Sequence, residues 1–218
     1  MAKKRGMGKH KGNAFERKVS KQLSLWWTHG KHDDIFWRTD TSGGRATIRK
    51  GKRTYGQHGD ICARHESGTA LTELCTIECK HGYVKDSLAD LIDRQERQKP
   101  TYLKFIMQAT KEKRSAKTPY WLLITQRTGR EPLVLFPHDM LMKLFQYQSH
   151  FSFFNLSPNF RLTIKVPDKK EAVWIAGTSL SEFTRWINPK CFILLHDKWK
   201  HHLARKRKQC YDTKNSIS

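Results

Sequence analysis

Lysine and arginine outnumber aspartate and glutamate by 42 to 20 in this chain, which leaves its 218 residues with a formal charge of +22. A fold with such an excess of like charge repels itself unless a polyanion neutralises it, and nucleic acid is the usual partner of this kind. A membrane surface is the alternative, but no window approaches about 18 consecutive apolar residues. No apolar stretch follows the basic N-terminus as a signal peptide requires. We therefore expect a soluble, intracellular protein without a membrane partner.

The length of the chain suits one α/β core with a small appendage. Residues 1–12 are basic and lack periodicity, which predicts a flexible arm. We place the core at residues 13–138. Residues 139–197 either extend this core or form a small accessory unit, and residues 198–218 form a basic tail.

The spacing of apolar residues predicts the elements of the fold. Helices are expected at residues 14–27 (with Asn13 as the cap), 86–97, from Pro100 onward, 140–145 and 180–186. Strands are expected at residues 35–38, 60–63, 70–80, 120–125, 133–136, 160–166 and 172–175. This order is typical of an α/β sheet with helices packed on it.

The strand expected at residues 70–80 combines an apolar face with a charged one. Because side chains alternate along a strand, Glu78 and Lys80 project side by side. The strand that begins at Asp60 precedes it by a short turn, so we expect the two strands to pair as a hairpin that brings Asp60 to Glu78. The opposite face of the later strand is apolar and consists of Cys75, Ile77 and Cys79.

Two carboxylates and a backbone carbonyl, here Asp60, Glu78 and Cys79, make a hard oxygen site for Mg²⁺ or Mn²⁺ with room for water and a phosphate oxygen. A lysine beside such a site can hold or polarise the attacking water of phosphodiester hydrolysis. The alternative is a solvent-facing strand on which Glu78 and Lys80 form a weak pair. Glu16, on the first helix, is a further candidate, with a solvated glutamate beside Arg17 as its alternative.

The five cysteines are odd in number and lack the spacing of a disulfide framework, which fits a reducing compartment. Histidines and cysteines do crowd one region, so structural zinc has to be considered, but no C-x-x-C pair is present. We favour buried thiols over a zinc site. The residues of this region are His58, Cys62, His65, Cys75, Cys79 and His81.

The segments GDICA and TIECKHG resemble the PD-(D/E)XK nuclease superfamily, with Asp60, Glu78 and Lys80 at the motif positions. Gly59 stands where the motif name has proline. GKHKGNAFERKVSKQL is similar to the first helix of archaeal and phage Holliday junction resolvase-like members, in which the glutamate matched by Glu16 joins the active site. The resemblance covers residues 12–136.

This resemblance implies a restriction-endonuclease-like mixed β-sheet core flanked by helices, here with basic flexible termini. It also implies that Gln108, in FIMQATKEKRSAKTPYWLLIT, supports the site and that the protein acts as a homodimer. A dimer interface could be lined by Trp26, Trp27 and Trp37, although packing in the core is the simpler explanation for these residues.

Contacts with DNA phosphates are expected from a Gly-rich basic loop, from a helix end and from both chain ends. No recognition helix or zinc finger is evident, so we expect branched DNA rather than a long specific sequence. WRTDTSGG resembles the Arg…Ser-Gly segment of the superfamily. The expected DNA-binding residues are Arg38, Ser42, Gly43, Arg45, Arg49, Lys50, Lys52, Arg53, Lys113 and Arg114.

The sequence thus predicts a Mg²⁺-dependent DNA endonuclease, with Mn²⁺ as a substitute, that selects Holliday junctions or other branched DNA during recombination. We expect it in the cytoplasm or nucleoid, or in the cytoplasm of a phage-infected host. One alternative is a restriction or recombination nuclease on ordinary duplex DNA. Another is a non-catalytic basic DNA-binding or packaging protein. An RNA-binding role lacks an aromatic-rich ribonucleoprotein motif.

Overall fold

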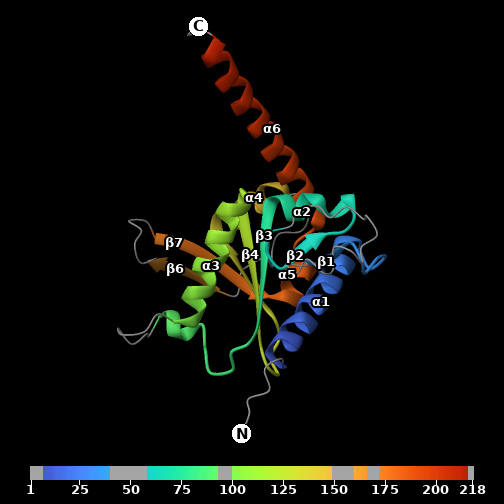
Figure 1. The fold of residues 1–218 in the computed structure, drawn as a ribbon, viewed down its shortest axis with the longest axis vertical. Helices are drawn as coiled ribbons and strands as arrows, with labels where there is room; N and C mark the ends of the chain where they lie inside the picture. Colours follow the sequence, from blue (N-terminus) through green and yellow to red (C-terminus); the bar gives the residue numbers. More distant parts are fainter. Residues whose placement is uncertain (1–6, 40–57, 93–99, 149–159, 166–171, 216–218) are drawn as a thin grey trace.

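The structure is a computed structural model that describes residues 7–39, 58–92, 100–148, 160–165 and 172–215 (Figure 1). The strands are β1 (Phe36–Arg38), β2 (Ile61–Ala63), β3 (Cys75–Gly82), β4 (Tyr120–Arg127), β5 (Leu133–Pro137), β6 (Phe160–Lys165) and β7 (Ala172–Ser179). The helices are α1 (Met7–Trp27), α2 (Thr69–Leu74), α3 (Thr101–Ala116), α4 (His138–Gln148), α5 (Leu180–Trp186) and α6 (Pro189–Asn215), with 3-10 turns η1 (Glu66–Gly68) and η2 (Ala89–Leu91).

A five-stranded mixed sheet in the order β3-β4-β5-β7-β6 forms the centre of the fold. β3 and β4 run parallel, and the remaining neighbours are antiparallel. β1 and β2 form a separate antiparallel pair. The predicted mixed sheet flanked by helices is therefore confirmed, and the strands β6 and β7 continue the same sheet beyond β5.

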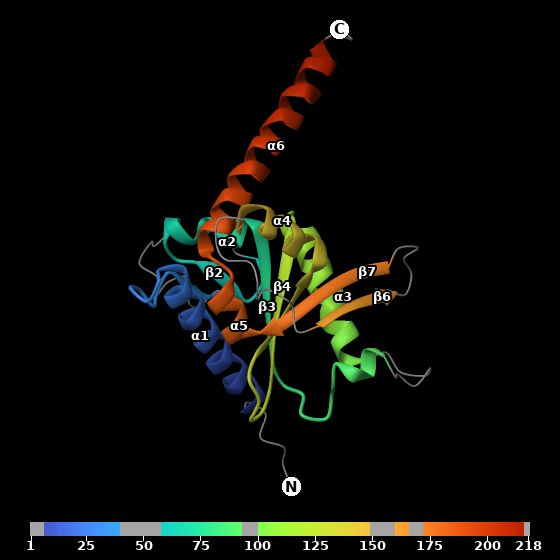
Figure 2. The same ribbon diagram turned by 180° about the vertical axis from the view of Figure 1, so that it is seen from behind.

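Helices cover both faces of this sheet, as the two opposite views show (Figures 1 and 2). α3 packs on one face against Trp121 and Leu123 of β4. α1, α4, α5 and the first turns of α6 pack on the other face, where Leu122 and Ile124 of the same strand point. Burial on both faces explains why β4 reads as a continuous apolar run rather than an alternating one. No helix in the described ranges is long and apolar enough to cross a membrane.

The chain from residue 69 to residue 74 is helix α2 and not the first half of a strand, as the sequence analysis had it. Leu71 and Leu74 are three residues apart, so a helix buries both on one side, and each is fully buried. Ala, Leu and Glu also favour helix over strand. The strand proper begins at Cys75, and its apolar face toward the core is confirmed.

The predicted hairpin between the Asp60 segment and β3 is wrong. β2 pairs instead with β1, with Arg38 opposite Ile61. The backbone of this segment reaches β3 through a parallel bridge between Gly59 and Ile77. Asp60 therefore approaches the middle of β3 from outside the sheet, and not across a turn.

Several predicted boundaries also change. α1 begins at Met7, within the expected flexible arm, so Asn13 lies inside the helix and does not cap it. The expected basic tail from Lys198 is helical as far as Asn215, as part of α6. In place of the helix expected at residues 86–97, the structure has only the short turn η2, and residues 93–99 lie outside the described part.

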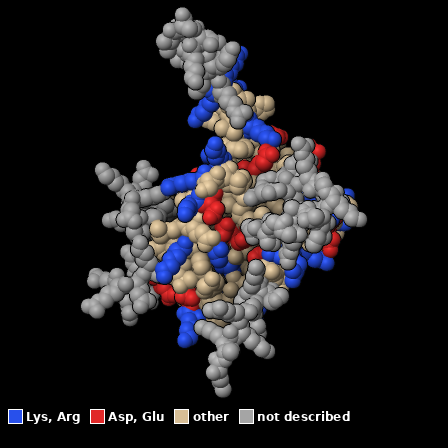
Figure 3. Space-filling view, viewed as in Figure 1, with Lys and Arg blue, Asp and Glu red and all other residues tan. Residues whose placement is uncertain are grey.

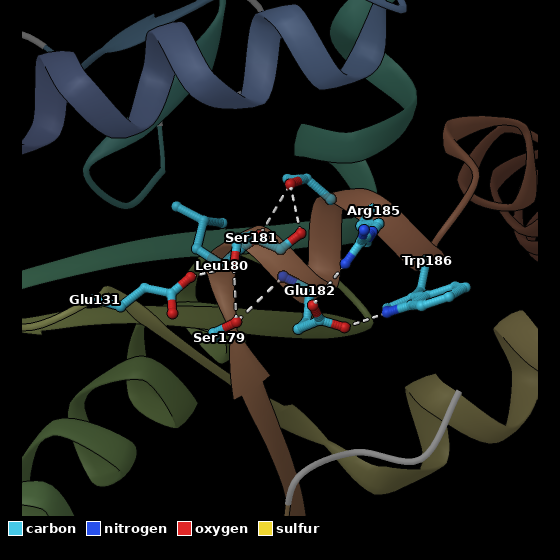
Figure 4. Close-up of polar contacts among 8 residues, drawn as sticks. Glu131, Ser179, Leu180, Ser181, Glu182, Arg185 and Trp186 are labelled. Carbon is cyan, nitrogen blue, oxygen red and sulfur yellow. Dashed lines mark hydrogen bonds and ion pairs between the residues drawn. The ribbon is translucent and has the colours of Figure 1, made fainter. Parts of the chain in front are cut away.

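The Ser179 side chain caps the start of α5 at the end of β7 (Figure 4). The Ser179 side chain accepts a hydrogen bond from the Glu182 backbone N–H at 3.2 Å. Ser181 donates to Glu131, while the Glu182 carboxylate accepts from Arg185 and from the Trp186 indole. These contacts turn the chain from the sheet into the helix that carries Phe183 into the core.

Two of the three tryptophans considered for a dimer interface are core residues. The indole N–H of Trp26 donates to the Ile187 carbonyl at 2.8 Å, and that of Trp27 to the Ser67 carbonyl at 2.8 Å. Both are buried, so the interface interpretation is wrong for them and core packing is confirmed. Trp37 is 39% exposed, with the Arg64 guanidinium 5.4 Å from its ring centroid.

Gly59 meets β3 so closely that a side chain has no room. Its φ is +74°, and an added Cβ would lie 2.5 Å from the Ile77 carbonyl oxygen. Gly129 has the same φ but nothing within 4 Å of such a Cβ, which makes it a matched control. We expect Gly129→Ala to cost about 1 kcal/mol of unfolding free energy from its backbone alone, and Gly59→Ala about 3 kcal/mol or more. Urea unfolding of both variants measures this difference, and equal losses would show that the contact is unimportant.

Candidate active site

The candidate site is built on the outer edge of β3, which no strand of the central sheet pairs. The Asp60 backbone N–H donates to the Ile77 carbonyl at 2.7 Å, and the Cys79 N–H donates to Asp60 Oδ2 at 2.8 Å. The N–H and C=O of one strand residue point to the same edge, so the Cys79 carbonyl also faces the Asp60 side. A carboxylate and a backbone carbonyl thus share this edge.

Glu78 and Lys80 project from β3 toward α3. Lys80 Nζ lies 3.1 Å from Glu78 Oε2 and 4.0 Å from Asp60 Oδ2. Gln108 on α3 donates from Nε2 to the same Glu78 oxygen at 3.2 Å. The structure therefore brings together four residues selected from the sequence, although Asp60 arrives by a different route than predicted.

Glu16 lies on α1, at the other side of this edge. Arg38 Nε donates to Glu16 Oε2 at 3.0 Å, and its Nη2 donates to Asn13 Oδ1 at 2.9 Å. Both charged side chains are largely buried. Burial is the main cause of the raised pKa of the Cys79 thiol, and the negative charges of Asp60, Glu16 and Glu78 raise this pKa further. Glu16 is therefore close to the two other carboxylates. Arg38, expected to contact DNA, is thus placed to hold Glu16.

The buried carboxyl of Glu78 is the most perturbed acid of the site. Burial, and then the nearby Asp60 carboxylate, raise its pKa from an ordinary 4.5 to about 7, although Lys80 opposes this. Glu112 adds a smaller upward contribution. Glu112 was not predicted from the sequence, although its position four residues after Gln108 puts both residues on one face of α3 and could have identified it.

Lys80 remains an ammonium in this setting. Burial acts to lower its pKa, but the Glu78 and Asp60 carboxylates outweigh burial and raise it. A raised pKa favours an electrostatic role for Lys80, in which the charged lysine orients and polarises other groups, over that of a proton acceptor.

The donor set fits a hard divalent cation. Asp60 and Glu78 already accommodate one positive charge, the Lys80 ammonium, and the Cys79 carbonyl faces the same edge. Mg²⁺ is typically held by one or two carboxylates and keeps several waters. Burial raises the pKa of the Cys75 and Cys79 thiols, which keeps them protonated and unsuited to zinc. Within the described ranges, no three His, Cys, Asp or Glu side chains are grouped as a metal cluster.

Of the remaining predicted DNA-binding residues, the structure describes Lys113 and Arg114, and these two lie away from the carboxylates. Lys113 is half-buried near the start of β3, where it faces Cys75 and Asp139, and Arg114 beside it is exposed. This is the opposite end of β3 from Lys80. The Gly-rich loop lies outside the described residues, and with it Ser42, Gly43, Arg45, Arg49, Lys50, Lys52 and Arg53.

Residues 7–192 match a protein family described as "Phage putative PDDEXK endonuclease". The chain belongs to this family. The matched range runs from the start of α1 into α6 and includes Asp60, Glu78 and Lys80. The resemblance to the PD-(D/E)XK superfamily is thereby confirmed for its phage type, and a nuclease that acts on DNA is supported. No curated protein and no solved structure matches the chain.

The raised pKa of Glu78 makes a prediction about stability. The folded protein holds this proton more tightly than the unfolded chain, so the stabilisation is complete below about pH 4.5 and is lost as the pH rises through about 7. In EDTA at pH 8, Glu78→Gln should therefore raise the unfolding free energy by about 2–3 kcal/mol. At pH 4.5 the gain should largely vanish. Urea unfolding at both pH values tests this, with exposed Glu66→Gln as the control; a gain independent of pH would contradict it.

Proposed function

We propose that the protein is a Mg²⁺-dependent endodeoxyribonuclease of a phage, active on Holliday junctions or other branched DNA. The observation that carries the proposal is the convergence of Asp60, Glu78 and Lys80 at the free edge of β3, in a chain that belongs to a PD-(D/E)XK family. A solvent-facing strand would not bury Glu78 to 3% exposure or bond it from a second element through Gln108.

Asp60, Glu78 and the Cys79 carbonyl would hold the cation, with Mn²⁺ as a substitute. Such a cation neutralises charge on the phosphate and makes a bound water a better nucleophile. Lys80, as an ammonium, would orient this water and oppose negative charge that builds up on the phosphate. Gln108 would keep the Glu78 carboxylate in place.

Glu16 and Arg38 would act as a second support of the site. Their ion pair at 3.0 Å is largely buried, which fixes the direction of the Glu16 carboxylate. Removal of Arg38 would leave that carboxylate without its partner, a costly change in a buried position. We therefore assign Arg38 to positioning Glu16.

The preference for branched DNA rests on the charge distribution. Basic residues spread over the chain contact phosphates without reading bases, and the formal charge of +22 supports strong contacts of this kind. Such contacts carry no sequence information, which makes a long specific sequence the poorer substrate. We propose a homodimer, because two symmetric cuts across a junction require two sites, and action in the cytoplasm of the infected host.

The second candidate function is that of a non-catalytic DNA-binding protein. It is favoured only by the charge of the chain. A binding scaffold has no need for a buried glutamate with a pKa near 7, which costs folding stability. The nuclease proposal explains that cost as a requirement of the site.

Cleavage of end-labelled four-way junction, flap and linear duplex of one sequence tests the proposal. We expect paired cuts near the branch in Mg²⁺ or Mn²⁺ and none in EDTA. Glu78→Gln should weaken both metal binding and catalysis, whereas Lys80→Ala should retain DNA binding and lose kcat by about 10²-fold or more.

The surface variants Glu66→Gln and Lys31→Ala serve as controls for this assay, since both positions are exposed. Equal cutting of all three substrates would keep the nuclease and overturn the branch selectivity. Tight binding without cleavage in any metal would replace the nuclease by the binding protein. Cleavage unchanged in Glu78→Gln would remove the proposed site.

A further inference from the structure

Helix α6 changes from a buried element to a solvent-exposed one along its length. Its first part packs in the core through Phe192 and Leu195. The buried ring of His196 lies 2.7 Å from Glu73 of α2, through Nε2 and Oε2, and Lys200 Nζ lies 3.0 Å from the same carboxylate oxygen. This contact anchors α6 on α2.

Beyond this anchor, residues 201–215 form a helical extension that we call the arm. Both views show it projecting away from the sheet and the other helices (Figures 1 and 2). Of the arm side chains that the structure describes, Leu203 is half-buried and the others are exposed. Lysine and arginine line the visible length of the projecting helix (Figure 3). The charged residues of the arm are Arg205, Lys206, Arg207, Lys208, Asp212 and Lys214.

We propose that the arm is a DNA-binding element that contacts the phosphate backbone away from the bond that is cleaved. Fifteen helical residues extend about 22 Å, a length over which duplex DNA presents one negative charge about every 1.7 Å. An α-helix also fits the major groove. The arm projects from the α2 side of the molecule, and α2 leads directly into β3, whose edge carries Asp60 and Glu78.

The arm is less suited to bind a second copy of the chain than to bind DNA. A coiled coil needs an apolar residue every three or four positions. From Leu203 the next such positions are Lys206 and Arg207, which are charged. Paired arms would bring these charges together, whereas a polyanion neutralises them.

The test removes three charges from the arm of the full-length protein through Arg205→Gln, Lys206→Gln and Lys208→Gln together. Glutamine has a helix propensity close to that of lysine and arginine, so the helix should persist, as far-ultraviolet circular dichroism can verify. The matched control removes three charges from exposed positions on the body: Lys31→Gln, Arg130→Gln and Lys190→Gln.

Binding to linear duplex is measured between 50 and 200 mM salt, in EDTA and in a Glu78→Gln background. Each lost phosphate contact should flatten the slope of log Kd against log salt by about 0.9, so the arm variant should lose about 2–3 units of slope. The control should lose less than one. Equal slopes in both variants would overturn the proposal, as would a loss of dimer mass in the arm variant without loss of DNA binding. This inference rests on the proposed function, but the assay involves no cleavage, so the two can fail separately.

A second and independent observation concerns Thr125 of β4. The register of the two parallel strands places it directly beside Lys80. The residue is 3% exposed, and its hydroxyl oxygen is buried without a hydrogen-bond partner in the structure. A buried polar group of this kind costs stability and needs an explanation.

We infer that Thr125 is a positioning residue for Lys80. The ammonium now donates to Glu78 Oε2, which also accepts from Gln108. If Glu78 held a cation, Lys80 would lose part of this partner, and the neighbouring Thr125 hydroxyl would be placed to accept its N–H instead. The Thr125 hydroxyl would thus lack a hydrogen-bond partner in the metal-free site and would accept a hydrogen bond from Lys80 in the metal-bound site.

The variant Thr125→Val removes the hydroxyl at nearly constant shape, and Thr125→Ser retains it. In EDTA, Thr125→Val should leave Tm unchanged or raise it, because an unpartnered group is lost. In saturating Mn²⁺ the wild-type and Thr125→Ser proteins should gain more Tm than Thr125→Val, whose Kd for Mn²⁺ should rise about fivefold. In a Lys80→Ala background the Thr125→Val change should have no such effect. Equal gains of Tm in all three proteins would overturn this assignment.

Discussion

The hydrogen bonds between Asp60 and the outer edge of β3 are the contacts on which the candidate site depends. The hydrogen bond from the Asp60 backbone N–H fixes the position of Asp60 along β3, and the hydrogen bond from the Cys79 N–H fixes the position of the Asp60 carboxylate. Because Gly59 has no side chain, the two backbones can approach this closely. Backbone groups, which move less than side chains, thus position the site. The pairing of β2 with β1 further fixes the segment that contains Gly59 and Asp60.

The two carboxylates of the site, Asp60 and Glu78, repel each other, and this repulsion lowers the stability of the metal-free protein. Glu78 is buried next to Asp60, and the pKa of about 7 measures how unfavourable its ionised form is there. Lys80 and Gln108 offset part of this cost by sharing one oxygen of Glu78. A bound cation would offset much of the rest, so the arrangement is better suited to the loaded site than to the protein alone. Buried carboxyl groups of this kind are characteristic of functional sites.

Sequence patterns predicted which side chains meet at the site better than how the chain brings them together. Glu78 and Lys80 follow from strict alternation in a strand, a local property, and the structure keeps it. The partner of the Asp60 segment depends on contacts across the fold, and no local pattern showed that β2 would pair with β1. Helix α2 was missed because its six residues, of which three are apolar, are too few to distinguish a short helix from a buried strand. The role of Arg38 also depends on tertiary structure, since its partner Glu16 lies 22 residues away.

The position of β3 at the border of the sheet has a consequence beyond catalysis. An exposed strand edge offers unpaired N–H and C=O groups to any passing strand and invites aggregation. Gly59 and Asp60 occupy two of these groups on β3 with a short bridge that carries a negative charge. A charged residue at such an edge is a common natural protection against strand addition. The residue that would bind the cation therefore also shields this border of the sheet, so a substitution of Asp60 would disturb both roles.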